Sequence, residues 1–243
     1  MIIICSDFGV RDPYNAQMQA VLANEAPGIP VVTLFPELPA YAIKTSAYLI
    51  SAYITEFPPG SVFLCVVDPG VGTGRLPVVV EAEGRWFVGP DNGLFEVIRM
   101  RAGSFHQWRI DYRPQDCSDS FHGRDIFAPV AGRLARGEAV PGIEMPVKSI
   151  VPMQWPEDLL QVVYCDHYGN AMTGLRGIMA SQGDRFVIKG YELQYARTFG
   201  EVPAGQAFWY INANGLVEFS MNQADISLSL GLEVGTEFRW IQD

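Results

Sequence analysis

The sequence predicts an α/β N-terminal domain with a mostly parallel sheet, followed by a smaller C-terminal antiparallel β-barrel domain. Apolar runs first alternate with amphipathic helical stretches, which is typical of parallel strands joined by crossover helices. Prolines and glycines then become frequent between residues 137 and 156. Beyond them, short strand-like runs are separated by Gly and Asn turns, as in small barrels. We place the α/β domain at residues 1–150 and the barrel at residues 151–243.

The first part of the N-terminal domain has the pattern strand, helix, strand, helix, strand. Apolar runs at residues 2–5, 31–34 and 62–67 predict buried strands. Between them, apolar side chains spaced three or four residues apart predict helices from about Tyr14 and over residues 40–55. A Pro-Gly pair ends each helix.

The second part of this domain is predicted to add a hairpin and two helices. Residues 78–80 and 86–88 flank a turn and form the hairpin, and a short helix follows at about residues 94–98. A polar surface loop over residues 112–120 precedes a longer helix that begins just after His122. A helix N-terminus lowers the pKa of a histidine and favours the neutral ring.

The C-terminal domain is predicted to consist of short strands. Its strand-like runs lie between turns such as Gly169–Asn170 and Asn214–Gly215, and cover residues 161–164, 185–189, 208–211, 216–219 and 237–241.

Composition bounds the class of protein. The chain has 243 residues, of which 49% are apolar and 18% charged, so it can bury a real core. A net charge of -10 argues against nucleic acid as a partner. The N-terminus resembles a strand and not a signal peptide, and no apolar run approaches the roughly 20 residues of a membrane span. We therefore expect a cytoplasmic protein without a membrane partner, whose four scattered cysteines are reduced thiols.

A Gly-rich loop over residues 67–75 is the strongest candidate for a functional element. It opens at the end of a buried strand, presents Asp68 at one end and Arg75 at the other, and contains three glycines. A strand follows it and not a helix, so it does not bind a dinucleotide pyrophosphate. Asp7 also follows a strand, and the ends of parallel strands meet at one edge, so Asp7 and Asp68 are expected to share a cleft. A purely structural Asp68–Arg75 pair is the alternative.

Six motifs, taken together and in this order, resemble those of the SAM hydroxide adenosyltransferases, a family related to the SAM-dependent fluorinases and chlorinases. The resemblance spans the chain from Ser6 to about Leu230, and its motifs are SDFG (6–9), VDPGVGTGR (67–75), GPDNG (89–93), FHGRDIFAPVA (121–131), DHYGN (166–170) and NANG (212–215). It implies an α/β domain joined to a β-barrel. It also implies a homotrimer that holds S-adenosyl-L-methionine (SAM) between the N-terminal domain of one subunit and the C-terminal domain of the next.

The resemblance further implies the reaction. Water attacks C5′ of the ribose and displaces methionine, so SAM is the substrate, adenosine and L-methionine are the products, and no cofactor or metal is needed. The Asp, Arg and His that characterise the hydrolytic members fall on Asp68, Arg75 and His122. The halogenating relatives lack this set, so water is favoured over halide.

Substrate-binding positions carry over less completely. Asp7 corresponds to the residue that holds the ribose hydroxyls, Tyr41 to an aromatic near the sugar, and Asn212 to a residue near the adenine. The methionine end corresponds to three residues of the DHYGN motif, which are Asp166, Tyr168 and Asn170. This chain departs from the family pattern at Tyr168, which replaces a Phe, at Ala213, which replaces a Ser, and at Leu34–Phe35, where relatives often have Thr-His.

The chemistry of the reaction agrees with this assignment. A sulfonium leaves as a neutral thioether, so the site needs an oriented and activated water and not a general acid. Histidine, with an ordinary pKa of about 6.5, is the natural proton acceptor. Arg75 stays protonated and can only stabilise developing hydroxide, while Asp68 orients its neighbours. The sequence leaves open which of the three takes the proton.

Three other functions fit parts of the pattern. A SAM-dependent halogenase would form 5′-halo-adenosine, which product analysis detects. A metal-dependent hydrolase could use five residues, Asp7, Asp68, Asp91, His122 and Asp125, but their spacing matches no metal-binding motif. A non-catalytic SAM- or adenosine-binding protein would have no need of the Asp, Arg and His set.

Overall fold

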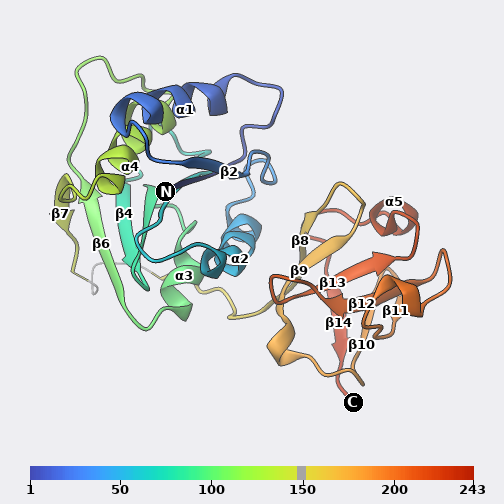
Figure 1. Ribbon diagram of the computed structural model, residues 1–243. Coiled ribbons are helices and arrows are strands. Elements are labelled where there is room, and N and C mark those ends of the chain that lie inside the picture. The colour runs from blue at the N-terminus through green and yellow to red at the C-terminus, as the bar shows by residue number, and fades with distance from the viewer. Residues whose placement is uncertain (147–151) are drawn as a thin grey trace. The chain divides into compact units, whose positions relative to one another are not determined.

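The computed structural model describes residues 1–146 and 152–243. The chain forms two compact units, shown in Figure 1. Unit 1 comprises Met1–Ala47 and Ile54–Trp155, and unit 2 comprises Tyr48–Tyr53 and Pro156–Asp243. The domain boundary predicted at residues 150 and 151 lies outside the described residues.

Unit 1 contains a seven-stranded mixed sheet with the strand order β2-β1-β3-β5-β4-β6-β7. Its strands are β1 (Ile2–Ser6), β2 (Val31–Phe35), β3 (Val62–Val66), β4 (Pro77–Ala82), β5 (Arg85–Pro90), β6 (Phe105–Ile110) and β7 (Gly142–Glu144). The first four strands in this order pair in parallel, whereas β4, β6 and β7 add antiparallel ladders. The prediction of a mostly parallel sheet was therefore wrong for one half of the sheet. The β4–β5 hairpin reverses the chain there, and β6 and β7 extend the sheet on its far side.

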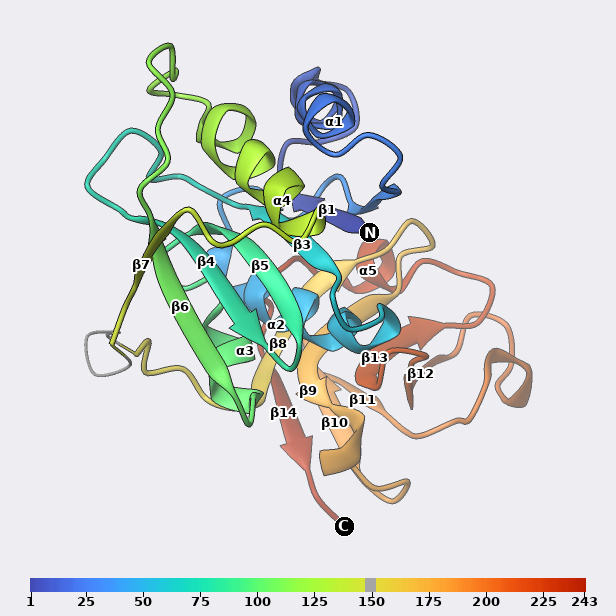
Figure 2. The ribbon, with the colours of Figure 1, turned by 60° about the vertical axis from the view of Figure 1, so that its left-hand side comes forward.

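Apolar alternation explains how helices cover the sheet. Alternate side chains of β1 and β3, such as Ile4 and Leu64, face one side of the sheet. They pack there with Met18 of α1 (Tyr14–Glu25) and Val130 of α4 (Ala128–Ala135). Figure 2 shows both helices on the same face of the sheet. The remaining helices of the first 146 residues are α2 (Ile43–Tyr53), α3 (Glu96–Arg101) and a short 3-10 turn at Ile54–Glu56.

The predicted helix after His122 begins as a π-helical turn. Residues Gly123–Phe127 form this turn, and α4 continues from Ala128. Pro129 has no backbone N–H and cannot donate to the carbonyl four residues earlier, which favours the wider turn. Single π turns of this kind are common at functional sites.

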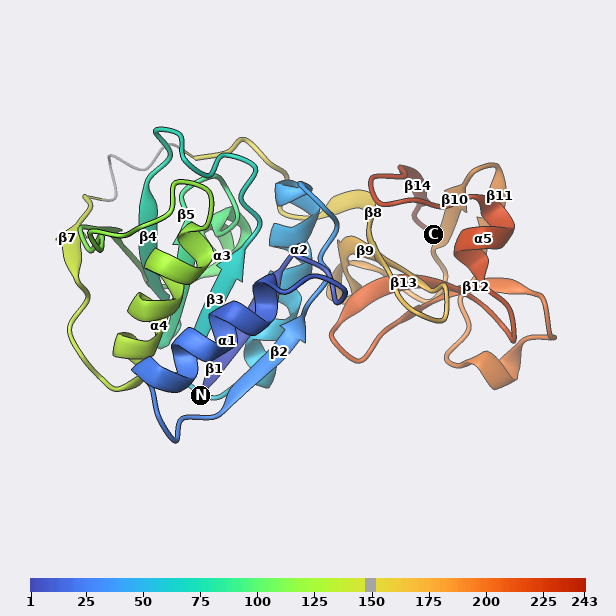
Figure 3. The same cartoon turned by 90° about the horizontal axis from the view of Figure 1, so that it is seen from above.

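Unit 2 is built from two antiparallel sheets, of order β12-β13-β9-β8 and β11-β10-β14 (Figure 3). Its elements are β8 (Leu159–Cys165), β9 (Ala171–Arg176), β10 (Arg185–Ile188), β11 (Tyr191–Leu193), β12 (Ala207–Ile211), β13 (Leu216–Met221), α5 (Ile226–Leu230) and β14 (Phe238–Ile241), with 3-10 turns at Gly177–Met179 and Phe199–Glu201. Aromatic side chains fill its core, with the Phe186 ring 5.0 Å from Trp209 and 5.5 Å from Phe219. The predicted antiparallel domain is present, and its closure into a barrel stays a prediction.

In the part of the chain that the structure describes, no helix combines the length and the apolar character needed to cross a membrane.

The contact between β5 and β3 gives a stability prediction at Gly89. A Cβ at this position would lie 2.2 Å from the backbone oxygen of Cys65. Because backbone cannot move aside cheaply, we expect Gly89→Ala to lower the free energy of unfolding by about 1–3 kcal/mol or more. Denaturant unfolding measures this. Gly74→Ala is the control, since nothing lies within 4 Å of its Cβ position, and equal stability of the two variants would contradict the prediction.

Candidate active site

The Gly-rich loop lies at the carboxyl edge of the parallel strands. It leaves β3 after Val66, and Asp68 follows two residues later. Gly72 has a φ of +77°, and a Cβ there would lie 2.8 Å from the backbone oxygen of Asp119. The loop therefore needs glycine at this position to pack against the segment that precedes His122.

Asp68 and Arg75 form a buried ion pair across the loop. The Arg75 Nε donates to both carboxylate oxygens of Asp68, at 2.9 and 3.0 Å, and Arg75 Nη2 donates to Oδ2. The two side chains are only 8% and 5% exposed. The guanidinium also lies over the ring of Phe127, with 5.1 Å between Cζ and the ring centroid. The Asp68–Arg75 pair, for which a purely structural role was the alternative, is thus held in a single orientation against the core.

His122 extends the ion pair into a chain of three residues. Arg75 Nη2 donates to Nδ1 of His122 over 2.8 Å. A guanidinium has donors only, so Nδ1 must accept, and the neutral ring carries its proton on Nε2. Burial lowers the pKa of His122, and the positive charge of Arg75 lowers it further. The predicted neutral ring is therefore supported, with burial and a neighbouring cation as its causes.

Two N–H groups of this chain of residues have no hydrogen-bond partner among the described residues. They are His122 Nε2 and Arg75 Nη1, and both are buried. Buried donors in folded proteins are nearly always paired with protein or water. Each of these nitrogens is therefore a donor that a bound acceptor could satisfy.

Asp7 and Asp68 line one cavity, as their places after β1 and β3 predicted. The cavity has a volume of about 270 Å³ and is also lined by Phe8, Asp12, Tyr14, Ala40, Tyr41 and Pro69. Asp7 Oδ2 accepts a hydrogen bond from the backbone N–H of Tyr41 at 3.0 Å. Burial raises the pKa of Asp7, and the negative charge of Asp68 adds to the rise. Three of the predicted site residues therefore meet here, and Asp68 links the cavity to Arg75 and His122.

In unit 2, the DHYGN turn is closed by its own aspartate. Asp166 Oδ1 accepts from the backbone N–H groups of Tyr168 and Asn170 at 2.9 and 2.8 Å, and Oδ2 accepts from the Asn170 amide at 2.9 Å. The side chains of Tyr168 and Asn170 line a cavity of about 510 Å³ together with Phe199, Met221, Gln223 and Ala224. The structure therefore joins Tyr168 and Asn170 at one cavity and uses Asp166 to shape the turn.

The side chain of Asn212 makes hydrogen bonds to the backbone of its own turn. Its Oδ1 accepts from the backbone N–H groups of Asn214 and Leu216, both at 3.0 Å, and its Nδ2 donates to Glu218 Oε2 at 2.8 Å. Glu218, which sequence reasoning missed, is almost fully buried and also accepts from the hydroxyl of Tyr210. Burial raises the pKa of Glu218. The signal for it was a single acid inside the apolar run of residues 216–221.

One of the five residues named for a metal-dependent hydrolase, Asp125, has other partners. Asp125 pairs with Arg124 and accepts from the backbone N–H of Ser118 at 2.9 Å. Within residues 1–146 and 152–243, no group of three His, Cys, Asp or Glu side chains is arranged to hold a metal ion.

Comparison with known proteins gives matches over both units. Residues 2–144 match the model of the SAM hydroxide adenosyltransferase N-terminal domain, and residues 160–239 match that of the C-terminal domain. A Thermus thermophilus protein named (R)-S-adenosyl-L-methionine hydrolase is 38% identical, with 98% of each chain covered. A protein of the same name from Salinispora tropica is 31% identical over 98% of this chain and 96% of its own.

Solved structures match as well. The crystal structure of an uncharacterized conserved protein from Thermotoga maritima is similar with a TM-score of 0.89 and 26% identity, and both chains are covered completely. The crystal structure of a conserved hypothetical protein from Thermus thermophilus has a TM-score of 0.79 and 35% identity, with 99% of each chain covered.

The environment of His122 predicts its titration. We expect the ring to titrate below the ordinary histidine value of about 6.5, because burial disfavours the charged ring and protonation would turn Nδ1 into a donor facing a guanidinium. In Arg75→Met the cation is gone, so the titration midpoint moves back up. Proton NMR of the ring follows both, with the resonance assigned by its loss in His122→Gln. A midpoint at or above the ordinary value in the unsubstituted protein would contradict the prediction.

Proposed function

The chain belongs to the SAM hydroxide adenosyltransferase family, and we propose that it hydrolyses SAM to adenosine and L-methionine. The observation that carries this proposal is the buried Asp68–Arg75–His122 chain, in which two donor nitrogens have no partner in the described part of the protein. The names of the relatives support hydrolysis over halogenation.

The reaction is a displacement at the ribose C5′. The oxygen of water forms a bond to C5′, the C5′–S bond breaks, and its electron pair stays on sulfur, which leaves as the neutral thioether of methionine. The water must lose one proton for the product to be an alcohol. A site that stabilises hydroxide therefore accelerates the step, because hydroxide attacks carbon far more readily than neutral water.

The geometry favours Arg75 and His122 as the groups that stabilise this hydroxide. Among the described residues, each offers one unpaired donor nitrogen, Arg75 Nη1 or His122 Nε2, and Asp68 fixes the guanidinium through the three hydrogen bonds at Nε and Nη2. His122 Nδ1 already accepts from Arg75, so the neutral ring has no free acceptor for a proton. His122 thus acts as a donor and not as the general base, and the proton passes to bulk water.

The cavity at Asp7 suits the sugar. The half-buried carboxylate of Asp7 is an acceptor for the two ribose hydroxyls, and Tyr41 and Asp68 share the cavity with it. A ribose held there brings its C5′ within reach of the Asp68 end of the loop.

The cavity at Tyr168 suits an aromatic base. Its lining combines the rings of Tyr168 and Phe199 with the amides of Asn170 and Gln223, and contains no charged side chain. Rings stack on the face of a purine and amides bond its edge, whereas the charged ends of methionine require charged partners. We therefore propose this cavity for the adenine, whereas the resemblance gives Asp166, Tyr168 and Asn170 to the methionine end and Asn212 to the adenine; in this proposal Asp166 and Asn212 shape their own turns. The homotrimer and the closed barrel that the resemblance implies remain part of the proposal.

Product analysis tests the function. Purified protein is incubated with each sulfonium epimer of SAM in ¹⁸O-labelled water, because the relatives are named for the (R) form. We expect equal amounts of L-methionine and adenosine, the latter with one ¹⁸O at the 5′ position, and the same products in added chloride or fluoride. Formation of 5′-halo-adenosine, or intact SAM of both epimers, would overturn the proposal.

Substitutions test the roles of the donors. Removal of one donor to a developing oxyanion typically costs about 10²–10³ in rate, so we expect losses of this size in His122→Ala and Arg75→Ala, with little change in KM for SAM. His122→Gln, whose amide reaches the Nε2 position, keeps more activity than His122→Asn, whose amide reaches only Nδ1. The opposite order would show that His122 acts through Nδ1, and full turnover in His122→Ala would remove it from the mechanism.

A further inference from the structure

The strand order places one turn directly between the two ends of the Gly-rich loop. The loop joins β3 to β4, but these strands are not neighbours, because β5 lies between them in the order β3-β5-β4. The loop must therefore cross the end of β5. The GPDNG turn at residues 89–93 begins at that end.

Two hydrogen bonds join this turn to both ends of the loop. Asn92 Nδ2 donates to the backbone oxygen of Val67 at 2.8 Å, immediately before Asp68. The backbone N–H of Asp91 donates to the oxygen of Leu76 at 2.9 Å, immediately after Arg75. The two residues of the ion pair are thus each one residue away from a bond to the same turn.

The bond at Val67 replaces a missing strand contact. The register of β3 with β5 ends at Leu64 and that with β1 at Val66, so the buried Val67 lies past both ladders. Asn92 supplies the donor there, and its Oδ1 accepts from the backbone N–H of Leu94 at 3.2 Å. An amide is suited to this place because one side chain both donates and accepts.

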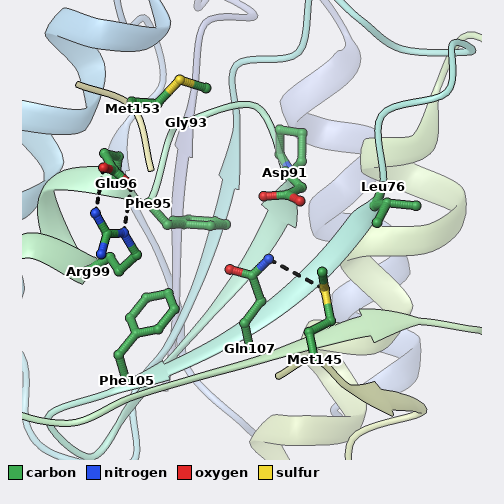
Figure 4. Close-up of a pocket in the computed structure, with 11 residues that line it drawn as sticks. Leu76, Asp91, Gly93, Phe95, Glu96, Arg99, Phe105, Gln107, Met145 and Met153 are labelled. Atoms are coloured by element: carbon green, nitrogen blue, oxygen red, sulfur yellow. Dashed lines mark hydrogen bonds and ion pairs between the residues drawn. The ribbon is translucent and has the colours of Figure 1, made fainter. Parts of the chain in front are cut away.

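The neighbouring aspartate faces elsewhere. Figure 4 shows the Asp91 side chain toward Gln107 in a cavity of about 300 Å³ that Leu76 also lines. Burial raises the pKa of Asp91, and the Gln107 side chain opposes part of the rise. Asp91 bonds the end of the loop through its backbone N–H, and Asn92 bonds the start of the loop through its side chain.

We propose that Asn92 is a positioning residue for the reaction, which fixes Asp68 and hence the Arg75 guanidinium at His122. The expected loss of rate rests on the proposed function, whereas the expected displacement of Arg75 from His122 does not. If the bond to Val67 is lost, the start of the loop shifts, and the 2.8 Å contact between Arg75 Nη2 and His122 Nδ1 lengthens. A misplacement of about 1 Å at reacting groups costs up to about 10²-fold in rate.

The test compares Asn92→Ala and Asn92→Asp with two controls. Asn92→Asp keeps the shape and the acceptor for Leu94 but loses the donor to Val67. Asp91→Asn changes the neighbouring side chain and leaves the loop bonds in place. Glu83 lies at the opposite end of the β4–β5 hairpin, and its Oε1 accepts from the backbone N–H groups of Gly103 and Ser104 at 2.6 and 3.2 Å. Glu83→Ala therefore also removes tertiary hydrogen bonds, but far from the loop.

We expect kcat for SAM to fall about 10- to 100-fold in both Asn92 variants, with KM within about twofold and both controls near the unsubstituted rate. In Asn92→Ala the NMR titration of His122 also moves up, because the Arg75 cation has left Nδ1. Unchanged kcat and an unchanged His122 titration would overturn the proposal, as would an equal kcat loss in Glu83→Ala. If the protein does not turn over SAM, the proposed function fails, but the titration still decides the role of Asn92. If Asn92→Ala does not fold, Asn92→Asp and Asn92→Ser carry the same comparison.

Discussion

A guanidinium buried to 8% exposure is the constraint on which the active site depends. Such a cation is very costly to desolvate unless a carboxylate and further hydrogen bonds compensate it. Asp68 supplies the carboxylate, and His122 can take an N–H of Arg75 only through an unprotonated nitrogen. Burial lowers the pKa of the histidine and the charge of Arg75 lowers it further, while the N–H that Arg75 donates fixes the tautomer. This hydrogen bond also determines which ring nitrogen is left to meet a ligand.

Sheet topology explains how a loop of this composition can hold such a group rigidly. A loop rich in glycine has high conformational entropy, and its order must come from contacts elsewhere. Here the loop crosses the end of β5, is bonded near both ends by the GPDNG turn, and packs at Gly72 against Asp119. The β4–β5 hairpin, which the sequence predicted, creates this crossing because β5 and not β4 pairs with β3, and that strand order was not predicted.

Much of the fold and part of the site could be predicted from local pattern. The buried strands β1 and β3 and the parallel start of the sheet follow from the apolar runs and the helices between them, and the meeting of Asp7 and Asp68 follows from the carboxyl ends of parallel strands. Strand β6 was missed because apolar and polar residues do not alternate regularly along Phe105–Ile110. The position of Arg75 between Asp68 and His122, and the use of the Asn212 amide in its own turn, depend on tertiary packing and leave no local signal.

In the proposed reaction, the charge of the substrate gives the neutral state of His122 a second consequence. SAM carries a positive sulfonium next to the carbon that is attacked, and the Asp68–Arg75 pair contributes no net charge. A protonated His122 would add an unpaired cation near this sulfonium and would repel it in a site of low dielectric constant. A neutral ring that donates through Nε2 can stabilise hydroxide without this repulsion. Displacement then converts a hydroxide and a sulfonium into two neutral groups, so an interior that solvates ions poorly favours the transition state over the reactants.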